Sequence, residues 1–120
     1  MPENRILLVE DEATSREILT EVLRGAGYDV HSVATASAAA TCLQSIPYAL
    51  LIADWVLPDG DGIHIADTAA QLGCKTMIVS SYVGNLPAGA AQRHQLLAKP
   101  VTAAALITAV RTAIGEPTGA

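Results

Sequence analysis

The stretch Ala49-Leu-Leu-Ile-Ala-Asp54 decides the fold class. A short aliphatic run with no polar break is typical of a β-strand buried on both faces, as in parallel sheets covered by helices. The run ends directly in a carboxylate, and the turn Pro58-Asp-Gly-Asp-Gly62 follows shortly after. The sequence therefore predicts a buried strand that delivers Asp54 to one edge of a parallel sheet.

Segments typical of strands alternate with segments typical of helices on both sides of this stretch. Short apolar runs predict four further strands, at 6–9, 28–33, 76–79 and 95–98. Five strands that alternate with about five helices imply right-handed βαβ units. We therefore expect a parallel sheet with helices on both of its faces.

Helical spacing of apolar residues separates the predicted strands. The first helix carries four apolar residues at helical spacing and then two glycines that stop it: Ile18, Leu19, Val22, Leu23, Gly25 and Gly27. Further helices are predicted at 36–45 and 63–72, and a short or irregular one within 83–94, where Gly and Pro recur. The last helix begins at the N-cap Thr102.

Length and composition predict one compact domain. The chain has 120 residues, of which 51% are hydrophobic, enough to bury a core without disulfides or a structural metal. We expect a single domain over 1–120, with its core at about 4–115 and a tail or linker start at 116–120. No apolar run approaches the roughly 20 residues of a membrane helix, and no signal peptide is evident. These features predict a cytoplasmic protein that does not contact the membrane.

Charge and cysteine usage exclude other classes of protein. The net charge is −5 and only seven Lys or Arg are present, so a basic face for direct nucleic acid binding is not expected. Cys42 and Cys74 lie far apart, without the spacing of a zinc site, and are expected to be free thiols. The histidines likewise lack metal-ligand spacing and are expected at the surface or in packing roles: His31, His64 and His94.

Chemically active residues stand at the ends of the predicted strands. Ligands of such sheets bind outside the carboxyl ends of the strands, which here carry Glu10, Asp11, Asp54, Ser80 and Lys99. Three crowded carboxylates repel one another, and one lysine does not balance them, so Mg²⁺ is the expected counter-charge. With a metal and an ammonium to hold phosphoryl oxygens, a carboxylate can attack phosphorus, and Asp54 is the best placed nucleophile.

Four segments of the sequence, in this order, resemble the receiver domain of bacterial two-component response regulators: Ile6-Leu-Leu-Val-Glu-Asp-Glu12, Leu51-Ile-Ala-Asp-Trp-Val-Leu-Pro-Asp-Gly-Asp-Gly62, Ile78-Val-Ser-Ser81 and Lys99-Pro100. The similarity runs from about residue 4 to residue 115. It implies a flavodoxin-like (βα)5 three-layer sandwich with strand order 2-1-3-4-5.

The resemblance also implies a metal site. Asp11 and Asp54 match direct Mg²⁺ ligands, the main-chain carbonyl of Val56 matches a further ligand, and Glu10 acts on the metal through water. Mn²⁺ is expected to substitute for Mg²⁺.

Phosphoryl transfer follows from the same resemblance. Asp54 matches the phosphoacceptor, Ser80 the hydroxyl that moves toward the phosphoryl group, and Lys99 the lysine that pairs with it. The implied donor is a sensor histidine kinase or a histidine phosphotransfer protein, and the implied output is a downstream protein or a fused output domain. Such a domain takes part in its own phosphorylation and dephosphorylation but is not an enzyme on other substrates.

Switching is expected to depart from the family pattern. Leu96 stands three positions before Lys99, where the family usually has Tyr or Phe. We therefore expect changes centred on residues 81–94, beginning at Ser81, rather than rotation of an aromatic ring. Val56 and Tyr82, each two positions after a site residue, are expected to control the access of water to the phosphoryl group.

Other interpretations of these residues stay open. The chain could be an interaction domain that is never phosphorylated, or a small Mg²⁺-dependent phosphohydrolase with Asp54 as nucleophile. The second reading lacks a general acid, because Val56 stands where a second aspartate would be expected. Acidic residues at helix starts can also be simple caps, which we expect for Asp61 and which residues 10–12 could be.

Overall fold

The aliphatic runs form five parallel strands of one sheet: β1 (Arg5–Val9), β2 (Asp29–Val33), β3 (Leu50–Asp54), β6 (Lys75–Ser80) and β7 (Gln95–Ala98). The computed structural model describes residues 2–81, 86, 87 and 89–116. The strand order is β2-β1-β3-β6-β7, which confirms the predicted order 2-1-3-4-5.

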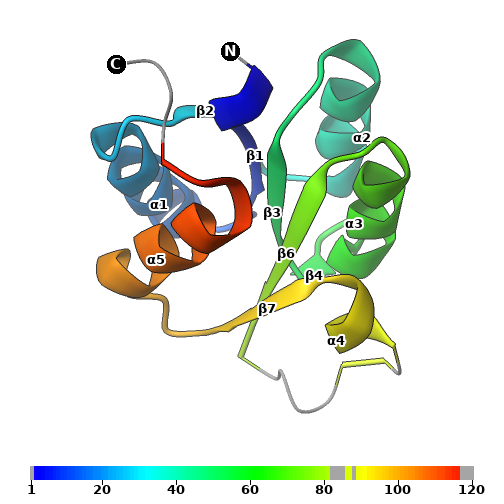
Figure 1. The fold of residues 1–120 in the computed structure, drawn as a ribbon. Coiled ribbons are helices and arrows are strands. Elements are labelled where there is room, and N and C mark those ends of the chain that lie inside the picture. Colours follow the sequence, from blue (N-terminus) through cyan, green and yellow to red (C-terminus); the bar gives the residue numbers. More distant parts are fainter. Residues whose placement is uncertain (1, 82–85, 88, 117–120) are drawn as a thin grey trace.

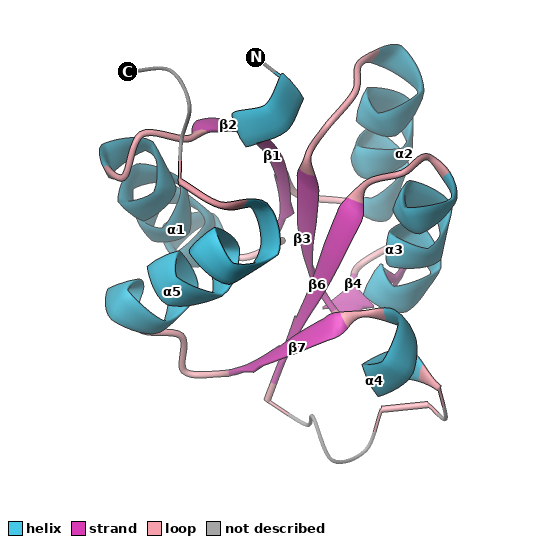
Figure 2. Cartoon of the chain, in the orientation of Figure 1, coloured by secondary structure: helices cyan, strands magenta, loops and turns pink. Residues whose placement is uncertain are grey.

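Helices cover both faces of this sheet, in the three layers expected for the fold (Figure 1). The helices are α1 (Ala13–Gly25), α2 (Ala36–Ser45), α3 (Gly62–Gln71), α4 (Ala90–Arg93) and α5 (Ala103–Ile114). Figure 2 shows α1 and α5 together on one face and α2 and α3 on the other. A 3-10 turn (Pro2–Asn4) precedes β1, and the turn after β3 contains a two-residue antiparallel pair, β4 (Val56–Leu57) and β5 (Gly60–Asp61).

The core has two halves because successive side chains of a strand point to opposite faces of the sheet. In β1, for example, Leu7 and Val9 pack toward α2 and α3, while Ile6 and Leu8 pack toward α1 and α5. All five residues of β3 are buried. This burial on both faces is the reason that the strands read as continuous apolar runs.

Side-chain caps fix where the helices begin. Thr35, Asp61 and Thr102 each accept a hydrogen bond from a backbone N–H in the first turn of α2, α3 and α5. Glu12 does the same at α1, where it accepts from two N–H groups. The structure therefore confirms Asp61 and Thr102 as caps, and of residues 10–12 it is Glu12 that caps α1.

One helix departs from its predicted pattern and another confirms its prediction. Ile18 is 56% exposed although it shares the helical apolar spacing of Leu19, Val22 and Leu23, so the apolar stripe of α1 extends beyond the core. The expectation of a short helix before β7 is confirmed, since α4 is a single turn. The two cysteines are free thiols, also as expected.

The two ends of the described chain lie at the same pole of the molecule (Figure 1). The hydroxyl of Tyr28, just before β2, donates to the carbonyl of Gly115, just after α5, at 2.7 Å. This bond ties the end of α5 to the amino ends of the strands. Within the described part of the chain, every helix is too short or too polar to cross a bilayer.

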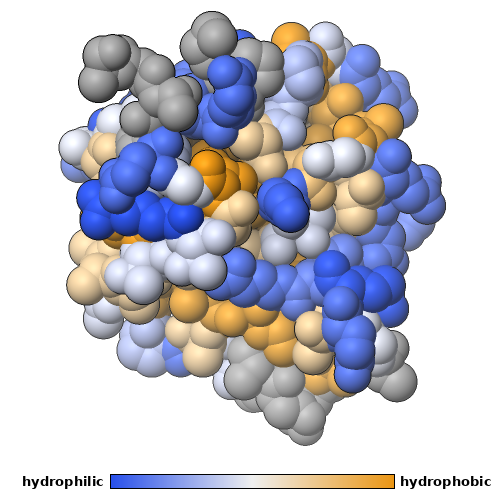
Figure 3. Space-filling model, in the orientation of Figure 1, coloured by the Kyte–Doolittle hydropathy of each residue, from blue (hydrophilic) through white to orange (hydrophobic). Residues whose placement is uncertain are grey.

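β7 is an edge strand, and its residues are less buried than those of the central strands. Leu96 and Leu97 are half-buried. In Figure 3, hydrophobic surface lies over the lower part of this face, where β7 runs, and hydrophilic residues border it.

Candidate functional site

Two neighbouring strands bring three carboxylates together at the carboxyl edge of the sheet. Val9 of β1 pairs with Ala53 of β3, so the residues that follow them, Glu10 and Asp54, lie beside each other. The carboxylate oxygens of Glu10, Asp11 and Asp54 lie within 4.8 Å of one another. The strand-end carboxylates picked out in the sequence thus form one cluster.

The ammonium of Lys99 completes this cluster, and we call the four residues Glu10, Asp11, Asp54 and Lys99 the acidic site. Lys99 Nζ lies 3.0 Å from Asp54 Oδ1 and 3.6 Å from Glu10 Oε1. Because β6 lies between β7 and β3, the long lysine side chain extends across the end of β6. The N–H of Lys99 donates to the carbonyl of Ser80 at 3.0 Å and fixes the lysine there.

Burial and crowding set the protonation of the buried carboxylates. Burial, and then the hydrogen bond with Glu10, raise the pKa of Asp54 to about 7, while Lys99 acts in the opposite direction. Burial also disfavours the charge of Glu10, but its contacts with Asp54, the Glu12 N–H and Lys99 hold its pKa below the ordinary value. The two pKa shifts are opposite in direction, and Asp54 is the carboxylate whose charge the metal-free site disfavours.

The donors of the acidic site fit a hard divalent cation. Glu10 and Asp54 are 3% and 6% exposed, whereas Asp11 is exposed and leaves one side of the cluster open to solvent. Oxygen ligands of this kind are those that Mg²⁺ takes, and its charge would balance carboxylates that one lysine leaves uncompensated. Among the described residues, no other group of three or more such ligands comes this close together.

The two predicted hydroxyl residues, Ser80 and Ser81, lie at the end of β6 and directly after it. Ser80 is buried at the last position of the strand, one residue beyond Val79, which pairs with Asp54. Ser81 is exposed. The fold thus places the Ser80 position next to the acidic site and the Ser81 position at the surface.

The predicted switch and gating residues are less uniformly placed. Val56 is the first residue of β4 and is 69% exposed. Leu96 is half-buried in β7 and packs against the half of the core that faces α2 and α3. Tyr82 lies outside the described residues. Trp55 packs against the core.

Gly62 is a site residue that the sequence pattern did not identify. A Cβ at this position would lie 1.8 Å from the carbonyl oxygen of Asp54, and the Gly62 N–H donates to the carbonyl of Trp55 at 2.7 Å. Glycine therefore lets the start of α3 touch the backbone of the acidic site. The Gly-rich turn at 58–62 indicates a tight backbone, but the sequence does not show which of its glycines lies against the carbonyl of Asp54.

Asp59 is a second residue whose partner the sequence could not show. Its carboxylate accepts from the N–H groups of Ala36 and Ser37 at 2.7 and 3.0 Å, which caps α2 from the loop after β3. These bonds keep the pKa of Asp59 below its ordinary value. The loop that follows Asp54 is thus anchored to α2.

A groove opens beside the acidic site, between α1 and the β7–α5 connection. Its volume is about 510 Å³, and it is lined by Glu10, Ser15, Ile18, Leu19, Val79, Ser81, Lys99, Pro100 and Val101. The exposed Ile18 is thus on the wall of a groove that reaches the acidic site. The Lys99–Pro100 peptide bond on its rim is cis.

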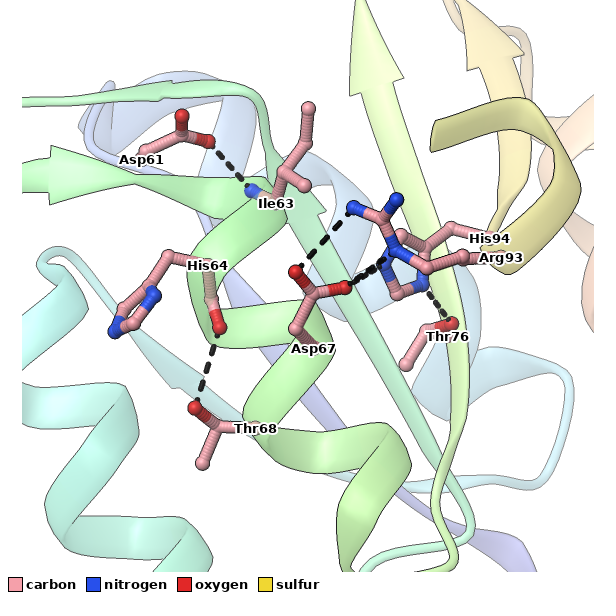
Figure 4. A network of polar contacts seen from close by, with 8 residues as sticks. All are labelled: Asp61, Ile63, His64, Asp67, Thr68, Thr76, Arg93 and His94. Carbon is pink, nitrogen blue, oxygen red and sulfur yellow. Dashed lines mark hydrogen bonds and ion pairs between the residues drawn. The ribbon is translucent and has the colours of Figure 1, made fainter. Parts of the chain in front are cut away.

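A second group of charged side chains, away from the acidic site, joins α3, β6 and α4 (Figure 4). We call Asp67, Thr76, Arg93 and His94 the Asp67 cluster. Arg93 donates to both carboxylate oxygens of Asp67 at 2.9 and 3.3 Å. His94, whose side chain is fully buried, contacts Asp67 Oδ1 through Nε2 at 2.7 Å and Thr76 through Nδ1. The hydrogen bond from Arg93, together with His94, lowers the pKa of Asp67.

Comparisons with known proteins agree with this arrangement. A family model for the response regulator receiver domain matches residues 6–111. Response regulator receiver protein CpdR of Brucella abortus is 34% identical over 101 residues, which cover 80% of this chain and 84% of that protein. DNA-binding response regulator MtrA of Mycobacterium tuberculosis is 33% identical over 115 residues, 89% of this chain but only 49% of MtrA.

A solved structure shares the fold. The CheY-like response regulator receiver domain from Methylobacillus flagellatus superposes with a TM-score of 0.83 at 24% sequence identity. The match covers 91% of this chain and 97% of that one. The likeness therefore extends over nearly the whole architecture.

Proposed function

This chain belongs to the response regulator receiver domain family, and on that premise we propose that it accepts a phosphoryl group on Asp54 in a Mg²⁺-dependent reaction. The observation that carries the proposal is the acidic site itself. A buried carboxylate at the end of a central strand lies 3.0 Å from an ammonium and within 4.8 Å of two further carboxylates.

Asp54 is the proposed nucleophile. An oxygen of its carboxylate attacks the phosphorus, the bond from phosphorus to the leaving group breaks, and an acyl phosphate forms. The carboxylate must be ionised to attack, and in the free protein burial and Glu10 oppose that ionisation. A divalent cation held by these carboxylates would supply the missing positive charge for them and for the phosphoryl oxygens.

The other residues of the site have supporting roles in this proposal. Asp11, Asp54 and the main-chain carbonyl of Val56 would hold Mg²⁺ directly, and Glu10 would act through water; Mn²⁺ would substitute. Lys99, already beside Asp54, would pair with a phosphoryl oxygen. The Ser80 hydroxyl would bind another oxygen, and this contact would couple phosphorylation to a change in the segment after β6.

The proposed donor is a phosphohistidine on a sensor kinase or phosphotransfer protein. The groove beside α1 supports this, because it leads from an exposed apolar rim at Ile18 to Lys99 and Glu10. The leaving imidazole would depart along the same path. The output would be a partner protein or a fused domain; the chain spans about half the length of the DNA-binding regulator that it matches.

Intact mass spectrometry after incubation with Mg²⁺ and acetyl phosphate tests the proposal. We expect one added phosphoryl group on the wild-type chain, and none after Asp54→Asn or when EDTA replaces Mg²⁺. Asp67→Asn is the matched control, since this carboxylate also contacts a cation but lies outside the site, and it should be labelled normally.

Four results would contradict the proposal. An adduct that persists in Asp54→Asn would move the acceptor to another residue, and an adduct that forms in EDTA would remove the metal from the reaction. If the wild-type chain gives no adduct and shows no response to Mg²⁺, an interaction domain that is never phosphorylated becomes the better interpretation. Sustained release of phosphate from small esters would instead favour a phosphohydrolase.

A further inference from the structure

Arg16 lies on α1 and turns its guanidinium back toward the loop that carries two residues of the acidic site. Its Nη1 donates to the carbonyl oxygen of Glu10 at 3.0 Å and lies 3.5 Å from the carbonyl oxygen of Asp11. The side chain is half-buried against this loop. One guanidinium thus contacts two consecutive peptide groups, both of which belong to residues of the acidic site.

These contacts hold the backbone from which the carboxylates project. The N–H of Glu10 donates to the carbonyl of Val33 at 3.0 Å, so Glu10 is held through its N–H on one side and, by Arg16, through its carbonyl on the other. The carbonyl of Glu10 and the nitrogen of Asp11 belong to one rigid peptide plane. The carbonyl of Asp11 belongs to the next peptide plane, so Arg16 contacts the planes on both sides of the Asp11 Cα and together these contacts restrain the direction in which the Asp11 side chain leaves the loop.

The two carboxylates need this support to different degrees. The carboxylate of Glu10 is buried and also accepts from the N–H of Glu12 at 3.0 Å. Asp11 is exposed, so little packing restrains its side chain. Besides its contact with Glu10, Asp11 therefore depends on the backbone that Arg16 holds for the direction of its side chain.

We propose that Arg16 is a positioning residue for the divalent cation of the acidic site. This inference rests on the proposed function. The guanidinium raises metal affinity by fixing the Glu10–Asp11 peptide, although its own positive charge repels the metal. Positioning and charge thus predict opposite signs: loss of Arg16 weakens Mg²⁺ binding if positioning dominates and strengthens it if charge repulsion dominates.

Titration of Mg²⁺ into Arg16→Met, followed by the fluorescence of Trp55 and by calorimetry, tests the proposal. Methionine keeps much of the apolar stem but removes the donors, and we expect about tenfold weaker binding. Arg16→Lys retains the charge and one set of donors, so we expect it to recover part of the loss. A variant that lost affinity merely through instability would show a matching fall in melting temperature in EDTA.

Arg24→Met is the matched control. Arg24 lies on the same helix and its guanidinium also donates to a backbone carbonyl, that of Val30 at 2.8 Å, but this carbonyl is not in the loop of the acidic site. We expect its Mg²⁺ affinity to equal that of wild type. If Arg16→Met binds Mg²⁺ as tightly as wild type or more tightly, the positioning role is overturned and the proposed function stands. If the wild-type chain does not bind Mg²⁺, both are overturned.

Discussion

The acidic site and the Asp67 cluster both combine carboxylates with basic side chains, but the effect on the carboxylate charge is opposite in the two. In the acidic site two buried carboxylates, Glu10 and Asp54, share the single ammonium of Lys99, and the pKa of Asp54 is raised to about 7. In the Asp67 cluster one carboxylate receives a guanidinium and contacts an imidazole, and its pKa is lowered.

The difference lies in how the charges are balanced. Asp67 has its partners in place and joins α3 to the segment before β7, which is a structural role (Figure 4). Asp54 is held where its charge is disfavoured, which weakens the free protein but leaves a site that a cation can stabilise. A buried carboxylate with too little positive charge around it thus indicates a ligand site, whereas a fully paired carboxylate indicates a structural role.

The largest expected change in stability comes from Gly62→Ala, which would crowd the backbone of the acidic site. The new Cβ would have to displace the carbonyl of Asp54, so we expect a loss of about 3 kcal/mol or more in the free energy of unfolding. Urea denaturation measures it. Gly25→Ala is the control: a Cβ there meets no atom within 4 Å, and in a helix the change should be neutral or slightly stabilising.

Asp54→Asn should stabilise the metal-free protein at pH 8. The folded-state pKa is raised, so the stability linked to protonation of Asp54 is present below its unfolded pKa near 4 and is lost as pH rises through about 7. Asparagine removes this loss, and we expect a gain of about 2–3 kcal/mol, reduced because Lys99 loses its nearest carboxylate.

Urea denaturation in EDTA from pH 4 to pH 9 checks this prediction. The difference between Asp54→Asn and wild type should be small at pH 4 and should grow until about pH 8. A variant that is less stable than wild type at pH 8 would show that Asp54 is as well compensated as Asp67.

His94→Phe probes the Asp67 cluster. Phenylalanine fills the ring volume but cannot hydrogen-bond, so it leaves Asp67 and Thr76 without their shared partner, and we expect a loss of about 2 kcal/mol. Thermal and urea denaturation give the value. His64→Phe is the control on the exposed side of α3, where the change should stay within about 0.5 kcal/mol.

Asp67→Asn should have the smallest effect, with a sign opposite to that of Asp54→Asn. The folded-state pKa of Asp67 is lowered, so its stabilisation is present above the unfolded pKa and is lost as pH falls through the folded value. Because Asp67 and Arg93 are partly exposed, we expect a loss of only about 1 kcal/mol at pH 7, which fades below pH 4. Equal stability of variant and wild type at pH 7 would show that the Asp67 carboxylate does not stabilise the fold, and would contradict the difference proposed between Asp67 and Asp54.

The sequence predicts most of the acidic site but little of the Asp67 cluster. Glu10, Asp54 and Lys99 each follow a recognisable apolar run, and parallel topology brings the ends of such runs to one edge. Asp67 and His94 are single polar residues on different elements, and no local pattern shows that three-dimensional packing joins them.

The same distinction explains the other residues that sequence analysis missed. The close approach of Gly62 to Asp54, the cap that Asp59 provides for α2 and the guanidinium of Arg16 behind the Glu10 loop are contacts between segments. Periodicity shows which face of a helix is apolar, but it does not show how much of that face the neighbouring elements cover. The exposure of Ile18 is a case of this, since the apolar stripe of α1 continues past the core into the groove.

The bond from Tyr28 to Gly115 has a practical consequence for handling the molecule. It anchors the end of α5 at the amino ends of the strands, beside the start of β1, while the acidic site lies at the carboxyl ends of the strands, on the opposite edge of the sheet. A tag, surface linker or fused reporter joined at either end would therefore stand away from the mouth of the site. Immobilising the chain by its ends should leave an incoming partner free to dock, which suits surface-based binding assays.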